Sequence, residues 1–448
     1  QTQMAQVQRQ SEPLQHQVEP LQGRLAQPSQ TSSKPPSSEA PFNKPTRHRK
    51  TSTSKRGGQT GHRGNGPTLL RPTEVHLSAP GPWPCGQGNV IALSPSHTHQ
   101  VSELPPIEME IHQVVLPQGH GQGGGRQLKA PGPSPEQAGS GPPLSARIGA
   151  LAGLHRPSWR LVQACCHSVC HIPLSLGAVP KVLNRGSQAI VPHYEAMATL
   201  AHQAPVGSME ETPWYGQNAL PWLWIRATAT VTYYRIDPPR ATAAFWALID
   251  AWPGLLGSDG YGVSQDWVNQ RHPCLAPLIR TARGLSQRRD PASSACGTAA
   301  LRALQRLCPL APEPPTGGQW PAWYARFCRL RGRYQERADE AGRLVRRLAR
   351  ERTSLWGFLR AQGGEPTNNR AERGLRCGVM WRQTSHGTDS AQGNRWVERS
   401  LSLRQTCRQL GPSPGGILVD AVPSLFQGHQ PDLAWLYCHP SHTAPCTL

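Results

Sequence analysis

Proline and glycine divide this chain into stretches that can and cannot form a core. The 448 residues include 46 Pro and 44 Gly, which cluster before residue 145 and again near 410–416. Proline removes a backbone donor and glycine raises the entropy lost on folding, so such stretches resist regular structure. The globular mass is therefore expected between Pro143 and Gln409, and the 14 Trp of the chain indicate a substantial core or stacking surface.

The chain carries a large excess of positive charge. It has 47 Lys and Arg against 27 Asp and Glu, a formal charge of +20 and a pI near 10.1. Such an excess indicates nucleic acid as the first candidate partner, and the charge alone also fits a membrane-surface or RNA-associated protein. No run of 18 apolar residues is present and the polar stretch Gln1 to Gln30 lacks a signal pattern. A soluble, intracellular protein without a membrane partner is expected.

The N-terminal residues are expected to form an arm and a tether. Residues 1–30 carry a heptad pattern that Pro13 and Pro20 interrupt, so an interrupted coiled-coil-like arm is predicted. Residues 31–70 read as a disordered basic tether with eight Lys or Arg against one acid. Because nearly all of its charges are positive, this tether is expected to contact phosphate groups rather than to serve only as a soluble linker. The candidate DNA-binding residues here are Lys50, Lys55 and Arg56.

Two smaller regions follow. Residues 71–130 hold short β-like pieces between Gly- and Pro-rich turns, which predict a small ribbon. Residues 140–204 turn to helical spacing, with Ser175 as a candidate cap for a third helix and Pro180 in its first turn. A helix-turn-helix and an ordinary helical hairpin fit this pattern about equally. Because Cys165, Cys166 and Cys170 lie in an amphipathic stretch, they are expected to pack in the core rather than to bind zinc.

Residues 205–409 change from helical to strand periodicity. The runs 222–230 and 231–236 are rich in β-branched and aromatic residues, a helix follows over 240–249, and the run 255–261 contains Asp259. This order predicts an α/β core with acids at strand ends. A helical, Arg-rich insertion is predicted at about 283–362, where the basic face is either solvated or a DNA track, and residues 410–448 are expected to form a tail.

The segment Pro366 to Arg373 places one carboxylate, Glu372, among amides and arginines. A carboxylate with positively charged neighbours stays ionised and can bind a divalent metal, while the neighbouring arginines can contact phosphate groups. Asn368 and Asn369 are expected to position Glu372 or to cap its helix. Trp381 is expected to lie in the core rather than to stack on a base. Arg373, Arg376 and Arg382 are candidate DNA contacts, with salt bridging or solvation as the alternative.

These segments together resemble the transposases of the insertion-sequence-66 type, a bacterial mobile-element family. Each motif is weak alone, but their order and intervals are specific. The N-terminal motifs are 32–38 and 57–62, the central ones are 234–238, 258–261 and 274–280, and the C-terminal ones are 366–373, 381–382 and 386–390.

The resemblance implies an RNase H-like catalytic core with a helical insertion, and a DNA transposase acting by two-metal-ion strand cleavage and transfer. Its three acids fall on Glu210, Asp259 and Glu372, which would hold Mg²⁺ or Mn²⁺. The implied partners are double-stranded DNA at element ends and target, accessory transposition proteins and a second copy of the chain. The implied location is the bacterial cytoplasm, in association with the nucleoid.

The chain departs from the family pattern at strict positions. The family's first acid lies in Asp-Glu-Thr, whereas Glu210 stands in its place here. Cys85 lacks its zinc-ribbon partners, since Pro82 and the segment 119–123 occupy their places, so a degenerate ribbon without structural zinc is predicted. Pro277 replaces a family histidine. A catalytically inactive DNA-binding remnant is therefore the alternative function.

Overall fold

The computed structural model describes residues 69–77, 98–103, 106–120, 127–131, 139–216, 220–237, 242–249, 251–259, 271–310 and 317–437. The chain divides into two compact units, Asn43–Glu110 and the remainder. The predicted arm, almost all of the tether with Lys50, Lys55 and Arg56, and the cysteine at position 85 lie outside the described residues. None of the described helices is long and apolar enough to cross a membrane.

The ribbon-like segment is represented by two local pairings. In the smaller unit, the Leu70 N–H donates to Gln100 Oε1 at 2.8 Å and Gln100 Nε2 donates to Leu70 O at 2.6 Å. In the larger unit, β1 (Gln118–His120) pairs antiparallel with β2 (Gln127–Lys129). Both strands are exposed, so this hairpin contributes little to any core.

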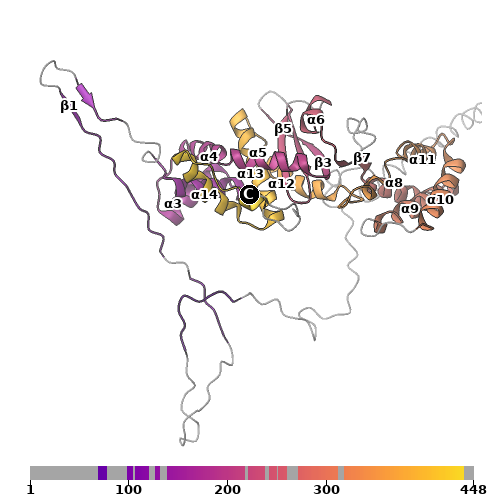
Figure 1. Cartoon of the computed structure of the whole chain (residues 1–448), viewed down its shortest axis with the longest axis horizontal. Helices are drawn as coiled ribbons and strands as arrows, with labels where there is room; N and C mark the ends of the chain where they lie inside the picture. The colour runs from indigo at the N-terminus through magenta and orange to yellow at the C-terminus, as the bar shows by residue number, and fades with distance from the viewer. Residues whose placement is uncertain are drawn as a thin grey trace, which may run out of the picture. The chain divides into compact units, whose positions relative to one another are not determined.

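A five-stranded mixed sheet forms the centre of the larger unit. Its order is β5-β4-β3-β6-β7, and β3, β4 and β5 form an antiparallel meander. β6 runs parallel to β3, and β7 runs parallel to β6, so β4 alone opposes the other strands. Figure 1 shows this sheet among the helices. The bounds are β3 Val206–Pro213, β4 Trp222–Ala227, β5 Thr232–Asp237, β6 Leu255–Ser258 and β7 Arg271–Pro273.

Strand alternation sends side chains to two separate cores. Leu223 and Ile225 of β4 face the main core, whereas Trp224 between them joins a smaller core with Phe245 of α6 (Thr242–Ile249). Successive residues of a strand point to opposite faces, which explains the division. The expected α/β class is therefore confirmed as a mixed sheet covered by helices.

Two helices cover the main face of the sheet. α12 (Asn369–Ser385) packs on β3 and β4, and α13 (Ala391–Leu410) packs on β5 (Figure 1). Glycines allow α12 to lie close: a Cβ at Gly374 would stand 2.5 Å from Ile225 Cδ1, and one at Gly378 would stand 2.3 Å from Leu223 Cδ2. The expected core position of Trp381 is confirmed, since it is 8% exposed.

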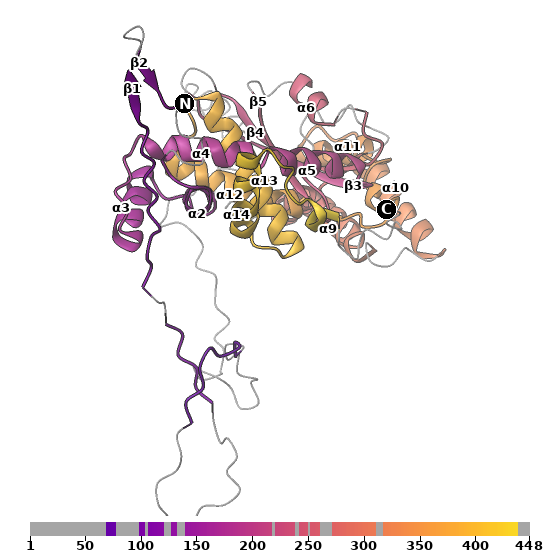
Figure 2. The ribbon, with the colours of Figure 1, turned by 60° about the vertical axis from the view of Figure 1, so that its left-hand side comes forward.

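A helical module packs against this layer. It comprises α2 (Pro142–Ala150), a π-helical turn (Leu151–His155), α3 (Trp159–Cys170), α4 (Ala178–Ala189) and α5 (Val191–Gln203). Figure 2 shows α14 (Pro414–Gln427) beside α2, and α14 also contacts α4; the short helix α15 (Ala434–Tyr437) follows. The segment expected to be a C-terminal tail thus contributes a helix to the module.

The helix caps differ from the sequence expectation at one point. Ser158 caps α3, with its hydroxyl accepting the Leu161 N–H at 3.2 Å. The cap expected at Ser175 is wrong, because α4 begins after Gly177 and no side chain caps it. Instead the Ser175 carbonyl accepts the Ala178 N–H at 3.0 Å. Pro180 does lie in the first turn, where its missing N–H is tolerated.

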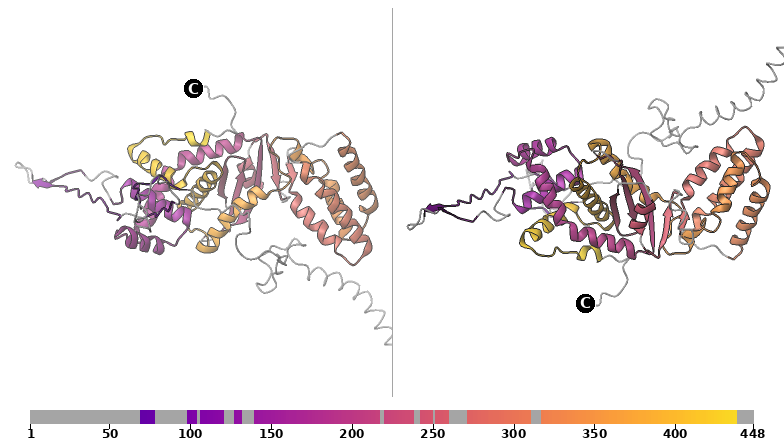
Figure 3. Two further views of the ribbon diagram at one scale, coloured as in Figure 1. Left: turned by 90° about the horizontal axis from the view of Figure 1, so that it is seen from below. Right: turned by 90° about the horizontal axis from the view of Figure 1, so that it is seen from above.

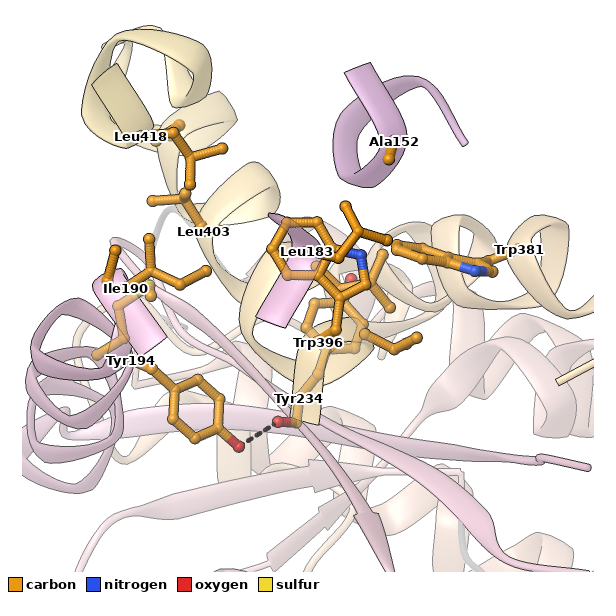
Figure 4. Close-up of a cluster of buried hydrophobic side chains, with 14 of the residues drawn as sticks. Ala152, Leu183, Ile190, Tyr194, Tyr234, Trp381, Trp396, Leu403 and Leu418 are labelled. Carbon is orange, nitrogen blue, oxygen red and sulfur yellow. Dashed lines mark hydrogen bonds between the residues drawn. The ribbon is translucent and has the colours of Figure 1, made fainter. Parts of the chain in front are cut away.

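Trp396 of α13 joins the helical module to the sheet layer. A Cβ at Gly153 would stand 2.6 Å from its ring, and one at Gly186 would stand 3.4 Å away, so small residues form the notch that holds the indole. In Figure 4 the ring lies between Leu183 and Tyr234. The Tyr194 hydroxyl donates to the Tyr234 carbonyl at 2.8 Å, which fixes α5 to β5.

The helical insertion has a core of its own. It contains α8 (Leu275–Ser286), α9 (Pro291–Gln305), α10 (Gln319–Tyr334), α11 (Glu340–Arg350) and two short 3₁₀ turns, Cys308–Leu310 and Gly357–Leu359. It starts directly after β7, earlier than the expected boundary near 283. In both views of Figure 3 these orange helices gather at the β7 edge of the sheet. A buried ion pair between Arg271 of β7 and Glu351 anchors them there.

Candidate functional site

Glu210 lies on the central strand of the sheet. β3 is paired on both sides, and Glu210 stands opposite Ile225 of β4 in the antiparallel register. Ile225 belongs to the main core, so Glu210 shares the face that α12 covers. Its side chain is half-buried. The strand therefore presents this carboxylate beneath the start of a helix rather than to open solvent.

Asp259 follows immediately after β6, the parallel neighbour of β3. The register pairs Ser208 with Gly257, and two further residues along both strands bring Glu210 and Asp259 level. The chain leaves the sheet here, and the Ser258 carbonyl accepts the Cys274 N–H at 2.7 Å from the end of β7. The strand next to the central one, β6, therefore ends with an acid, as predicted for the run 255–261.

Glu372 occupies the first turn of α12 and is half-buried. The residues that lead into α12 are pinned to the end of β7. The Leu275 N–H donates to the Pro366 carbonyl at 3.0 Å, and the Asn368 N–H donates to Cys274 Sγ at 3.1 Å. These bonds hold the start of the helix at the end of β7, beside the end of β6 that Asp259 follows.

Asn368 connects the helix start to the central strand. Its side chain is fully buried, and Nδ2 donates to the Met209 carbonyl at 2.7 Å and to Glu210 Oε2 at 2.6 Å. It does not cap α12, so the expected capping role is wrong for this amide. It orients Glu210 rather than Glu372, and Asn369 is exposed on the helix.

The charges of the three acids act on one another. Burial and then the negative charges of Asp259, Glu211 and Glu372 raise the pKa of Glu210, and the Asn368 hydrogen bond lowers it; together they bring it to about 9. A buried carboxylate among like charges favours its protonated form. Asp259 after β6 and Glu372 on α12 are therefore close enough to Glu210 on β3 for their charges to raise its pKa.

Cys274 was missed by reasoning from the sequence alone. It is buried at the junction of β6, β7 and α12, and burial raises the pKa of its thiol to about 11, with Glu372 and Glu210 adding to the shift. Its motif, Cys274 to Pro277, was recognised for a lost histidine rather than for the thiol. Pro277 itself lies in the first turn of α8, where proline is tolerated.

The acids suit a hard divalent cation in donor chemistry and charge. Three carboxylates supply the oxygen ligands that Mg²⁺ prefers. As they stand, however, no three His, Cys, Asp or Glu side chains within the described ranges are close enough to hold a metal ion. The three acids therefore match Mg²⁺ in ligand type, but within the described residues they do not form a complete metal site.

The candidate arginines of α12 fall into two groups. Arg373 and Arg376 are exposed on the helix. Arg382 instead fastens α12 to β3, since its Nη1 donates to Thr212 Oγ1 at 2.7 Å and to the Pro213 carbonyl. Its guanidinium also lies 5.6 Å from the centre of the Tyr215 ring. Arg382 therefore has a structural role that sequence reasoning did not anticipate.

Comparison with known protein families supports the resemblance drawn from the motifs. Residues 153–311 match the model of the Transposase IS66 family, a range that includes Glu210 and Asp259 and ends before Glu372. Residues 1–68 match a family of unknown function, DUF6444. No curated protein matches the chain. The resemblance to the insertion-sequence-66 transposases is thereby confirmed.

Proposed function

We propose that this chain, which carries a domain of the IS66 transposase family, is a DNA transposase that cleaves element ends and joins a 3′-hydroxyl to target DNA. The observation that carries the proposal is the meeting of β3, β6 and α12 at Asn368 and Cys274. In support, hydrogen bonds and strand register connect the three distant segments that carry these acids. Scattered surface carboxylates would not require such a junction.

The proposed core is RNase H-like. In support, an antiparallel meander is extended by two parallel strands in the order β5-β4-β3-β6-β7. One acid stands on the central strand, the second follows the adjacent parallel strand, and the third begins a helix after the helical insertion. The helical module of α2 to α5 is proposed to bind DNA as a helix-turn-helix-like unit, with the basic tether as an additional phosphate contact.

Glu210, Asp259 and Glu372 are proposed to hold two divalent metals, Mg²⁺ or Mn²⁺. Bound there, the metals would activate the attacking oxygen and stabilise the leaving oxygen of an in-line displacement at phosphorus. Asn368 orients the Glu210 carboxylate through its 2.6 Å hydrogen bond. The exposed Arg373 and Arg376 stand near Glu372 on α12, where they are suited to contact DNA phosphates.

A cleavage and strand-transfer assay on duplex DNA with Mg²⁺ or Mn²⁺ tests the proposal. Asp259→Ala is expected to abolish product, because it removes a carboxylate at the junction. Asp420→Ala, at an exposed position on α14, is the matched control and should retain activity. If wild-type protein cleaves and Asp259→Ala cleaves equally well, the assignment of this site is wrong.

A second candidate function is a catalytically inactive DNA-binding remnant. Two observations favour it: the first acid is Glu210 rather than Asp, and no three described acids, histidines or cysteines are close enough to form a closed metal site. A remnant would bind duplex DNA in a salt-dependent manner and would yield no nicked product with either metal. Binding and nicking measured on one preparation separate the two functions.

A further inference from the structure

The helical insertion holds more than half of the net charge of the chain. Residues 275–360 contain seventeen arginines and no lysine against six acids, a formal +11 out of +20. Arginine remains charged at any physiological pH and its planar fork suits phosphate oxygens. The insertion also has its own apolar core. Its charge is therefore a property of one folded subdomain rather than of a disordered tail.

The acids of the insertion are mostly used inside it. Asp290 and Asp339 cap α9 and α11 by accepting backbone N–H groups at 2.8 and 3.0 Å. Four of the five acids in its described ranges also lie against arginines, and these arginines offset their charge. The pairs are Asp290–Arg337, Asp339–Arg337, Glu340–Arg288 and Glu351–Arg271. Arg343 also lies 3.9 Å from Glu340, but its side chain is 58% exposed and Glu340 already pairs with Arg288. The remaining arginines therefore set the sign of the outer surface.

Those outer arginines follow helical stripes. On α11, Arg343, Arg346 and Arg350 are exposed at spacings of three and four residues, on the side opposite its buried stripe. On α10, three exposed arginines recur at the same spacings, at positions 326, 329 and 333. The first and last arginines of each stripe are seven positions apart, or roughly 10 Å along the helix. The two helices pack against each other, so both stripes belong to one helix pair.

We propose that the arginine stripes of α10 and α11 bind the phosphate backbone of duplex DNA. The inference rests on the proposed function and adds a DNA contact in the insertion, separate from the three carboxylates. The two stripes together supply six arginines that can neutralise phosphates along one side of a duplex. The contact would be independent of base sequence, since phosphates carry no sequence information.

The surface chemistry favours a duplex over other anionic partners. Single-stranded nucleic acid is bound on exposed aromatic platforms, yet Trp320, Trp323 and Trp356 pack against one another at 4.6 to 5.5 Å between ring centres. Among described residues of the insertion, Tyr324 is the one large apolar side chain counted as exposed, at 36%. A membrane-surface helix would need an apolar face as well.

The test removes four arginines from the full-length chain. The variant combines Arg326→Gln, Arg329→Gln, Arg343→Gln and Arg350→Gln. Arg346 is kept because its Nη1 donates to the two backbone carbonyls of Gln335 and Arg337, which follow α10. Binding of a random 30-base-pair duplex is measured by anisotropy over a series of salt concentrations. Each lost phosphate contact lowers the slope of log K against log salt by about 0.9.

A loss of slope of about 2 or more is expected, and a smaller loss overturns the inference. The same four positions changed to Lys form the matched control, because Lys keeps the charge and should keep the slope. An equal loss with Lys also overturns the inference. Single-stranded DNA, duplex RNA and anionic vesicles serve as competitors, and preference for any of them over duplex DNA counts against it. Two double variants, one per helix, replace the quadruple if that does not fold.

Strand cleavage is measured on the same preparations, so that this inference and the proposed function can fail separately. If the wild-type chain cleaves DNA and the salt slope of the Gln variant is unchanged, the transposase function is supported and the binding of DNA by the arginine stripes is rejected. A reduced slope without any wild-type cleavage would support the stripes and favour the inactive remnant.

Discussion

Glu210 differs from the aspartate of the family by one methylene, and that difference is the most consequential one at the scale of single residues. Its carboxylate accepts a 2.6 Å hydrogen bond from Asn368 Nδ2, which holds the longer side chain in a defined position. Asp in its place would withdraw the carboxylate toward β3. Under the proposed function, a shift of about 1 Å in this carboxylate can change the rate by about a hundredfold.

Glu210→Asp is expected to raise the rate of metal-dependent strand cleavage by up to about a hundredfold, because it returns the first carboxylate to the family geometry. The control is Glu211→Asp, which makes the same chemical change on the opposite face of β3. Single-turnover cleavage of a labelled duplex is the measurement. An unchanged or lower rate in Glu210→Asp would show that the first acid is not what limits this chain.

Asn368→Ala is expected to destabilise the fold by about 1–3 kcal/mol, because it leaves the buried Met209 carbonyl and Glu210 without their donor. Asn369→Ala, one residue along and exposed, should change stability by less than about 0.5 kcal/mol. Urea unfolding of both variants provides the comparison. Equal midpoints would mean that the amide contributes no net stability.

At the scale of elements, the close approach of α12 to the sheet positions Glu372. The sequence predicted β4, β5 and the acid that follows β6, because β-branched runs and polar termini leave a local pattern. It did not predict β3, which carries Glu210, or β7. It did not predict that Asn368 would turn inward, since an amide before a helix is more often a cap. The packing of α14 on α2 also escaped prediction, because Pro- and Gly-rich residues precede it and contacts between chain ends leave no local signal.

Gly378→Ala tests this close approach. The added Cβ would stand 2.3 Å from Leu223 Cδ2, so the variant is expected to lose about 1–3 kcal/mol by overpacking. Gly332→Ala on α10 is the matched control, because nothing lies within 4 Å of its added Cβ. That variant should gain roughly 0.5–1 kcal/mol from helix propensity. Similar effects at both positions would contradict the packing of α12 described above.

At the scale of the whole molecule, His193 links the helical module to the last described helix. It is 1% exposed on α5, and its ring centre lies 6.1 Å from that of Trp435. Burial lowers the pKa of His193 to about 4, and the nearby Asp432 partly offsets the effect. The neutral ring is therefore the form that the folded chain accommodates, which couples the junction of distant segments to pH.

The folded pKa of His193 lies below the unfolded value of about 6.5, so its neutral form supports folding above pH 6.5. As the pH falls from 6.5 to 4, His193 becomes protonated in the unfolded chain but stays neutral in the folded chain. Up to about 3 kcal/mol of the free energy of unfolding is therefore lost. His193→Gln removes this titration. Urea unfolding of both proteins at pH 8, 6.5, 5 and 4 should show curves that are parallel at high pH and converge in acid. A constant difference across this range would place the acid sensitivity of the molecule in other groups.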